Sequence, residues 1–271
     1  MNRLAFSVLA AMLSQSAFAA DADIDPKRYG WFSGDWRLIV GASAFYAPEY
    51  VGDDDLALTI VPLISLGKAG PEARFTSRND NISFSLYDNG PLRLGPTGKV
   101  VFQRDEGDSD DLDGLEEVPW GAEIGAFAEY YPTDWLRIRG ELRQGIHSHY
   151  GLVGDVDVDA FYDVTSAVRV SGGPRLSFAS ADYFDTYYGV SESESAASGL
   201  DEYEPGSGFQ SAGVGGAINW KATDRITASL FGEYARLVGP AADSPIVEER
   251  GSENQFTVGV STTYRFNFTI P

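Results

Sequence analysis

The ionisable side chains that could bind a ligand or take part in catalysis are concentrated in one stretch of the chain, between positions 123 and 159. They are ionisable and all stand at odd-numbered positions: Glu123, Glu129, Arg137, Arg139, Glu141, Arg143, Asp155, Asp157 and Asp159. Successive side chains of an extended chain point to opposite faces, so each strand would carry these charges on one face. Such a face cannot pack in a dry core unless its charges are paired. We therefore expect it to meet water or opposite charges on neighbouring strands.

A hairpin over residues 120–146 would position most of these charges. Pro132, Thr133 and Asp134 supply a short turn. If the strands pair symmetrically about Thr133, Glu129 faces Arg137, and likewise Glu123 faces Arg143, so opposite charges meet across the strands. Two interpretations stay open. The charges line a water-filled pore for small solutes, or they close on one another as a plug of ion pairs and leave the protein as a docking surface.

The other face of this hairpin is apolar, with Trp120, Tyr130 and Trp135 at the strand ends around small and aliphatic residues. Aromatic residues at both ends of an apolar band are typical of strands that cross a membrane. An ordinary antiparallel sheet over a soluble core would explain one such hairpin equally well. Recurrence of the pattern along the chain favours the membrane interpretation.

The sequence predicts an all-β fold, a closed antiparallel up-and-down transmembrane β-barrel of about twelve strands, with ten as the alternative. Pro62 is expected to form a bulge, a strand over 73–86 is expected to break near Asn79, and residues 191–208 are expected to form a surface loop. Besides the hairpin, the expected strands are 36–46, 56–65, 73–86, 92–103, 152–162, 164–178, 183–190, 209–220, 226–234 and 255–266.

The N-terminus predicts export. One arginine, an apolar run from Leu4 to Leu13 and the Ala17-Phe18-Ala19 site form a secretory signal peptide over residues 1–19, which leaves residues 20–271 as one barrel domain. The formal net charge of -20 would repel nucleic acid, so we expect no nucleic-acid partner. The chain has no cysteine and therefore no disulfide and no thiolate ligand.

Signals for catalysis or metal binding are weak. Asp111, Asp113 and Gly114 resemble part of a calcium loop, but the twelfth position of that loop is a tryptophan, so we expect a solvated acidic loop. His147 and His149 would share one face of a strand, and two ligands are too few for zinc without a carboxylate such as Asp155. No nucleophile elbow, phosphate loop or HExxH motif is present. We expect no enzyme, no cofactor and no metal site.

Several segments occur in an order that resembles a known family. They are GASAFYAPEYVGDDD (Gly41 to Asp55), VPLIS (Val61 to Ser65), DGLEEVPWGAEIGAF (Asp113 to Phe127), YYGVS (Tyr187 to Ser191) and the stretch from Ser244 to Phe266. Together they resemble the MltA-interacting protein (MipA)/OmpV family of Gram-negative outer-membrane proteins. The chain departs from the family at its end, where residues 267–271 follow the aromatic Phe266.

The resemblance implies a barrel in the outer membrane, in contact with its lipid. In some members it implies a scaffold that joins a lytic murein transglycosylase to a murein synthase. In others it implies roles in adhesion or envelope stress.

Overall fold

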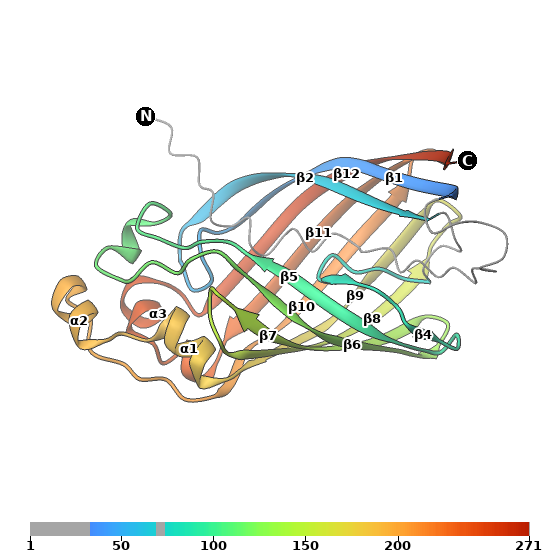
Figure 1. Ribbon diagram of the computed structural model, residues 1–271. Helices are drawn as coiled ribbons and strands as arrows, with labels where there is room; N and C mark the ends of the chain where they lie inside the picture. The colour runs from blue at the N-terminus through green and yellow to red at the C-terminus, as the bar shows by residue number, and fades with distance from the viewer. Residues whose placement is uncertain (1–32, 69–73, 271) are drawn as a thin grey trace.

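One antiparallel sheet forms the body of the protein in a computed structural model that describes residues 33–68 and 74–270 (Figure 1). The predicted signal peptide lies outside the described residues. The strands are β1 Gly34–Pro48, β2 Leu56–Lys68, β3 Ile82–Ser83, β4 Tyr87–Asp88, β5 Leu92–Val101, β6 Gly121–Thr133, β7 Leu136–Ile146, β8 Leu152–Asp163, β9 Val168–Ala179, β10 Gly208–Lys221, β11 Ile226–Leu237 and β12 Asn254–Ile270.

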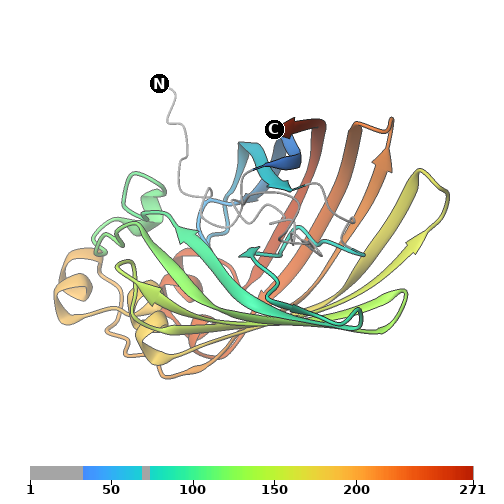
Figure 2. The same ribbon diagram turned by 45° about the vertical axis from the view of Figure 1, so that its right-hand side comes forward.

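From β5 to β12, strands that are adjacent in the sequence are neighbours in the sheet, and β1 pairs with both β2 and the last strand, β12. The ladder runs β2-β1-β12-β11-β10-β9-β8-β7-β6-β5-β3, with β4 also on β5, and the sheet curls into a half-barrel (Figure 2). This confirms the predicted all-β, up-and-down fold class. In the described residues the ladder ends at β2 and β3, so the expected full closure is not seen there.

The strand expected over 73–86 forms only after the break expected near Asn79, and its first part is wrong in the described residues, which leaves the ladder open beside β2 and β3. Only the short β3 and β4 of this region pair with β5. Residues 74–81, which we call the inward segment, leave the sheet and carry two buried polar side chains, Asp80 and Asn81. Their partners lie on the inner face of the sheet, as described below, and this polar bonding outcompetes strand pairing.

The outer face of the sheet carries the apolar rows predicted from the sequence. Leu142 is 57% exposed and Val258 53% exposed, although both stand in the middle of strands. Trp120, Tyr130 and Trp135 are also exposed, at the ends of β6 and β7. Apolar side chains exposed along whole strands have no place on a sheet in water, whereas lipid accommodates them.

The hairpin of β6 and β7 differs from prediction in register. Glu129 pairs with Arg139 rather than Arg137, because an irregularity between Tyr130 and Thr133 moves the turn to Asp134 and Trp135. The shift is by two residues, which keeps every side chain on its predicted face. The predicted charge pairs therefore still form, now between diagonal neighbours.

Two further details of the strands concern their ends and edges. The bulge expected at Pro62 is absent, since Pro62 pairs in unbroken register with Ala42. Proline fits there because β2 has a hydrogen-bonded neighbour on one side only in the described sheet. Strand β12 continues past Phe266 to Ile270, so the residues beyond the family's usual aromatic end extend the ladder with β1.

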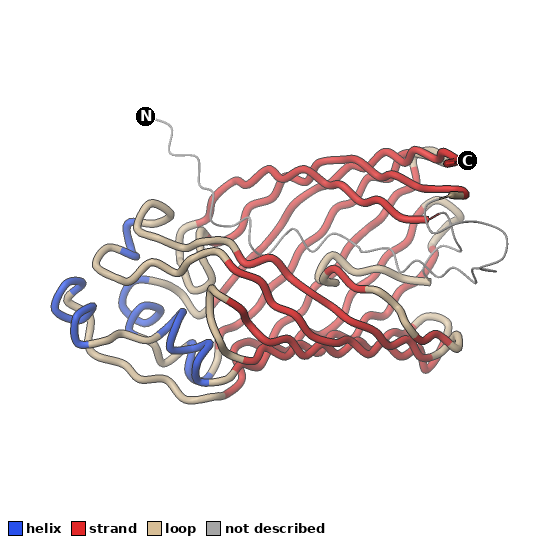
Figure 3. Tube along the Cα trace, viewed as in Figure 1, coloured by secondary structure: helices blue, strands red, loops and turns tan. Residues whose placement is uncertain are grey.

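Helices gather at one end of the sheet, opposite the end where β12 finishes (Figure 3). They are η2 Asp110–Leu112, α1 Ala181–Tyr188, α2 Glu192–Ser198, η3 Gly239–Ala241 and α3 Pro245–Arg250, and together we call them the cap. Among the described residues, the helices are too short or too polar to cross a membrane.

Two predictions fail in the cap. The strand expected over 183–190 is helix α1, in which Phe184 and Tyr188, four residues apart, are both buried against Leu237 and Val247. Aromatic residues favoured the strand prediction, but the spacing of the buried pair is helical. The loop expected over 191–208 contains α2, which opens with a capping box between Ser191 and Glu194.

Candidate functional site

The nine ionisable residues singled out in the sequence lie on the face of β6, β7 and β8 opposite the exposed apolar row. Eight of them are buried, and Asp155 is partly buried. Each takes part in at least one ion pair. We call this group, with the partners named below, the ion-pair cluster.

Arg137 is the centre of the ion-pair cluster and is fully buried. Its Nη1 and Nη2 donate to the two carboxylate oxygens of Asp80 at 2.7 and 2.8 Å. Its Nε and Nη2 donate to Asp159 at 3.1 and 2.6 Å, and Nη1 also donates to Glu129 at 3.2 Å. All the donor groups of this guanidinium are thus satisfied by carboxylates.

Arg143 forms a second centre nearer the cap. Its three nitrogens donate to Glu123 at 2.7 Å, Glu141 at 2.7 Å and Asp155 at 2.6 Å. Arg139 joins the two centres, because it donates to Glu141 at 2.8 Å and to Glu129 at 3.2 Å. Charges that are buried and paired in this way fill the space they occupy and exclude water from it.

The inward segment completes the ion-pair cluster from the other side. Besides the pair of Asp80 with Arg137, the side-chain amide of Asn81 donates to Glu141 at 2.8 Å. Phe75 stacks on Phe161 of β8 with ring centroids 4.7 Å apart. The inward segment is therefore fixed to the inner wall by polar and aromatic contacts.

Sequence reasoning missed three members of the ion-pair cluster. Arg93 of β5 donates to Glu129 at 3.0 Å, and Arg175 of β9 pairs with Asp157 and Asp159. Both stand directly opposite an acid in the register, so extending the cross-strand charge rule to the flanking strands would have found them. Asp80 gave no such signal, because it comes from outside the strands.

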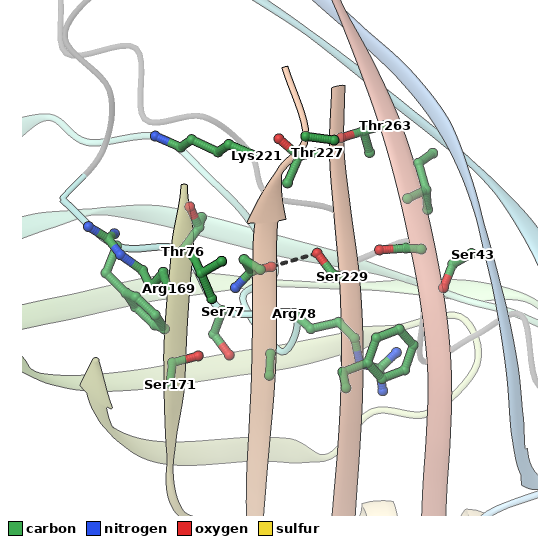
Figure 4. Close-up of a pocket in the computed structure, with 18 of the residues that line it drawn as sticks. Ser43, Thr76, Ser77, Arg78, Arg169, Ser171, Lys221, Thr227, Ser229 and Thr263 are labelled. Atoms are coloured by element: carbon green, nitrogen blue, oxygen red, sulfur yellow. Dashed lines mark hydrogen bonds between the residues drawn. The ribbon is translucent and has the colours of Figure 1, made fainter. Parts of the chain in front are cut away.

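The other half of the interior is hollow. A cavity of about 1120 Å³ lies between the inner faces of β9 to β12, β1 and the inward segment, toward the end where the short turns are (Figure 4). The inner row of β10 contributes Gly215 and Ala217 to its wall, and these small residues leave room where β6 and β7 carry long charged side chains. The interior is thus filled on one side and open on the other.

An acidic group lies in the loops near the cap. Carboxylate oxygens of Asp53, Asp54 and Asp111 come within 4.8 Å of one another. The sequence had associated Asp111 with Asp113, which is not part of this group. Burial raises the pKa of Asp53, and burial followed by the charge of Asp54 raises the pKa of Asp111. These carboxylates repel one another at neutral pH.

The two histidines do not share a strand face as predicted, because both lie in the loop between β7 and β8. His147 has a positive φ of 76° and its ring packs against Trp120. His149 is buried, with Nε2 3.3 Å from a carboxylate oxygen of Glu123. In the described residues, neither histidine belongs to a group of three side chains able to hold a metal.

Comparison with known proteins identifies relatives over nearly the whole chain. The sequence model of the family described as "MltA-interacting protein MipA" matches residues 40–266. Outer membrane protein Omp26La of Vibrio anguillarum is 25% identical over 278 residues, covering 98% of this chain and 100% of the relative. Outer membrane protein OmpV of Vibrio cholerae serotype O1 is 25% identical over 279 residues, with the same coverage.

Solved structures of outer-membrane channels are more distant. The NanC porin is 9% identical with a TM-score of 0.42, over 86% of this chain and 99% of that one. The KdgM porin is 10% identical with a TM-score of 0.35, over 86% and 99%. Similarity of this degree does not bear on the function of the chain.

Proposed function

The chain belongs to the MltA-interacting protein MipA family, and from this premise we propose that it is a scaffold in the outer membrane that docks murein-remodelling enzymes, a lytic transglycosylase and a murein synthase. The observation that carries the proposal is the filled half of the interior. Buried ion pairs rigidify the wall formed by β5 to β9 without leaving a passage along it. A scaffold needs a rigid surface, and the proposal assigns no reaction to the chain.

The geometry also suggests which end would dock the enzymes. The turns after β6, β8 and β10 are short and lie at the end where β1 starts and β12 finishes (Figure 1). Short turns of outer-membrane barrels face the periplasm, where murein lies. The cap, with its helices and long loops, would then face outward. We therefore assign the docking surface to the short-turn end.

Site-specific photo-crosslinking in intact cells tests this assignment. A photo-reactive residue at Asp134 or Thr223, in two of the short turns, should give crosslinked products that contain a murein enzyme. The matched control is the same residue at Ser193, an exposed position on α2 in the cap. Crosslinks to murein enzymes from Ser193 alone, or from none of the positions, would contradict the scaffold.

A second candidate function is the binding or passage of small solutes, and the cavity beside the ion-pair cluster favours it. At about 1120 Å³ it lies just above the range of about 300–1,000 Å³ that is usual for small-molecule sites. Recording from planar bilayers tests passage directly. Steady ohmic current steps would support a channel, and a silent bilayer containing folded protein would leave the scaffold as the better assignment.

Both candidates assume export of a mature chain of residues 20–271 after removal of residues 1–19. Mass spectrometry of the protein purified from outer membranes should give a mature N-terminus at Ala20. The same preparation should show heat-modifiable mobility on gels, as folded barrels do. An intact N-terminus, or a protein recovered in the soluble fraction, would count against the assignment.

A further inference from the structure

We infer that the cavity between β9 to β12, β1 and the inward segment binds small organic anions, molecules that carry a carboxylate or phosphate group. The inference rests on the second candidate function, the binding or passage of small solutes, and names the class of solute. It is independent of the scaffold.

Charge is the first argument. The described lining of the cavity includes seven cationic side chains: Arg175, which belongs to the ion-pair cluster, Arg169, which pairs with Asp163, and Arg37, Arg78, Lys221, Arg225 and Arg265. Within the described lining they meet three carboxylates, Asp163, Asp224 and Glu233. This local excess of cations has the opposite sign to the chain as a whole, with its formal net charge of -20. A general surplus of basic residues therefore cannot explain it.

Placement of the cations is the second argument. They come from β1, β9, β10 and β12, from the turn after β10 and from the inward segment, so their fields add within the cavity. Figure 4 shows Arg78, Arg169 and Lys221 among them. The guanidinium of Arg78 lies 4.2 Å from the ring centre of Phe231 and 5.9 Å from that of Phe45. These rings hold Arg78 in place by cation–π contact. In a site with low-dielectric walls, such a field attracts anions.

Hydroxyl groups supply the third argument. Ser43, Ser171, Thr227 and Thr263 lie around the cavity (Figure 4). Hydroxyls donate to anionic oxygens and also bond to hydroxyl groups of a solute. Guanidinium groups bind carboxylates and phosphates through paired hydrogen bonds. The lining therefore suits an anion that also carries polar groups, more than an apolar ligand.

Isothermal titration calorimetry of the folded, full mature protein in detergent tests the inference. The probes are gluconate, inorganic phosphate and, as the neutral partner of gluconate, sorbitol. Gluconate should bind and sorbitol should not. Arg265→Gln should weaken gluconate binding about tenfold or more, because it removes a charged hydrogen-bond donor. Lys221→Gln is the second variant, in case the first fails to fold.

Arg236→Gln is the control variant, because Arg236 of β11 lies outside the cavity lining and pairs with Glu253 in the loop before β12. It should leave gluconate binding within about twofold of the parent. Phosphate binding without gluconate binding would restrict the class to phosphates and still support an anion site. Equal binding of gluconate and sorbitol, or gluconate binding unchanged in both cavity variants, would overturn the inference.

Planar bilayers separate failure of the inference from failure of the underlying function. Under a KCl gradient, a reversal potential of the sign for chloride would support the anion site. A conducting protein that prefers potassium would overturn the anion inference while leaving small-solute passage intact. No conductance together with no binding of any probe would overturn both.

Discussion

Replacing Arg137 by methionine should destabilise the protein more than any substitution at an exposed ion pair. Arg137 is fully buried and makes five hydrogen bonds to three carboxylates. Without it, Asp159 keeps Arg175 and Glu129 keeps Arg93 and Arg139. Among the described residues, Asp80 keeps Arg139 at 3.7 Å and a backbone bond from Ser77. The main loss is therefore one uncompensated buried carboxylate.

Breaking a buried ion pair by removing one partner costs about 3–5 kcal/mol, and we expect Arg137→Met to lower the free energy of unfolding by that amount. Asp80→Asn in the same background removes the unpaired charge. The double variant should therefore be less destabilised than the sum of the single variants by about 2 kcal/mol, within the range for residues in contact. The control is Arg236→Met at a half-exposed pair, which should cost less than about 1 kcal/mol.

Equilibrium urea unfolding in lipid vesicles, followed by tryptophan fluorescence and gel mobility, measures the parent, the two single variants, the double variant and the control. A coupling between positions 137 and 80 would establish that the inward segment is bound to the wall in the folded protein in lipid. Additive effects in the cycle, or a cost for Arg137→Met no greater than that of the control, would refute the reasoning, because Asp80 would then not depend on Arg137.

Three further predictions concern the outer face, the acidic loops and the cap. Leu142→Arg, on the exposed apolar row, should lower the free energy of unfolding in vesicles by about 2–4 kcal/mol. Ile146→Arg, at the end of the strand, should lower it by less. Equal free energies of unfolding for the two variants would argue against a lipid-facing row. Because the pKa values of Asp53 and Asp111 are raised, the folded loops bind protons more readily than the unfolded chain, so their stability should rise as the pH falls through those raised pKa values. The protection factors for hydrogen exchange of residues 49–55, which correct for the pH dependence of the intrinsic exchange rate, should therefore rise on acidification, and Asp111→Asn should weaken this rise; protection factors that fall on acidification would reverse the sign of the argument. Phe184→Ala should destabilise the cap by about 3–5 kcal/mol, so that proteases cleave the cap while the sheet stays resistant. A cap as resistant to proteases as that of the parent would contradict the packing role of Phe184.

The sequence predicts the strands far better than the segments between them. Period-two patterns set which face each residue of β6 to β8 occupies. The predicted faces are correct although the predicted register is wrong by two residues, because a shift of two leaves each side chain on the same face. Helix α1 was missed because a short aromatic run fits a strand and a helix equally well until its burial is known. The start of α2 does have a signal in the sequence, because Ser191 followed three residues later by Glu194 is the pattern of a capping box.

In the candidate site, too, the residues on strands can be predicted and those between strands cannot. Alternation along the strands assigns the charges to the inner face, and cross-strand pairing predicts that Arg93 and Arg175 join them. The inward segment could not be predicted, because its polar residues find partners far away in the sequence, as Asp80 does on β7. Local patterns carry no information about such contacts.

The division of the interior follows from residue size. On β6 and β7 the inner rows carry arginines and glutamates, whose long side chains meet each other and the aspartates of β8 and fill the space. On β10 the corresponding row contains Gly215 and Ala217, which fill little of it. The inward segment lies between the two halves and offers Asp80 to the first and Arg78 to the second. Loss of Asp80 from the ion-pair cluster would therefore also displace Arg78 from the cavity, so Asp80→Asn should weaken gluconate binding although it removes a negative charge. Stronger binding in that variant would mean that charge alone, rather than the position of the inward segment, governs the cavity.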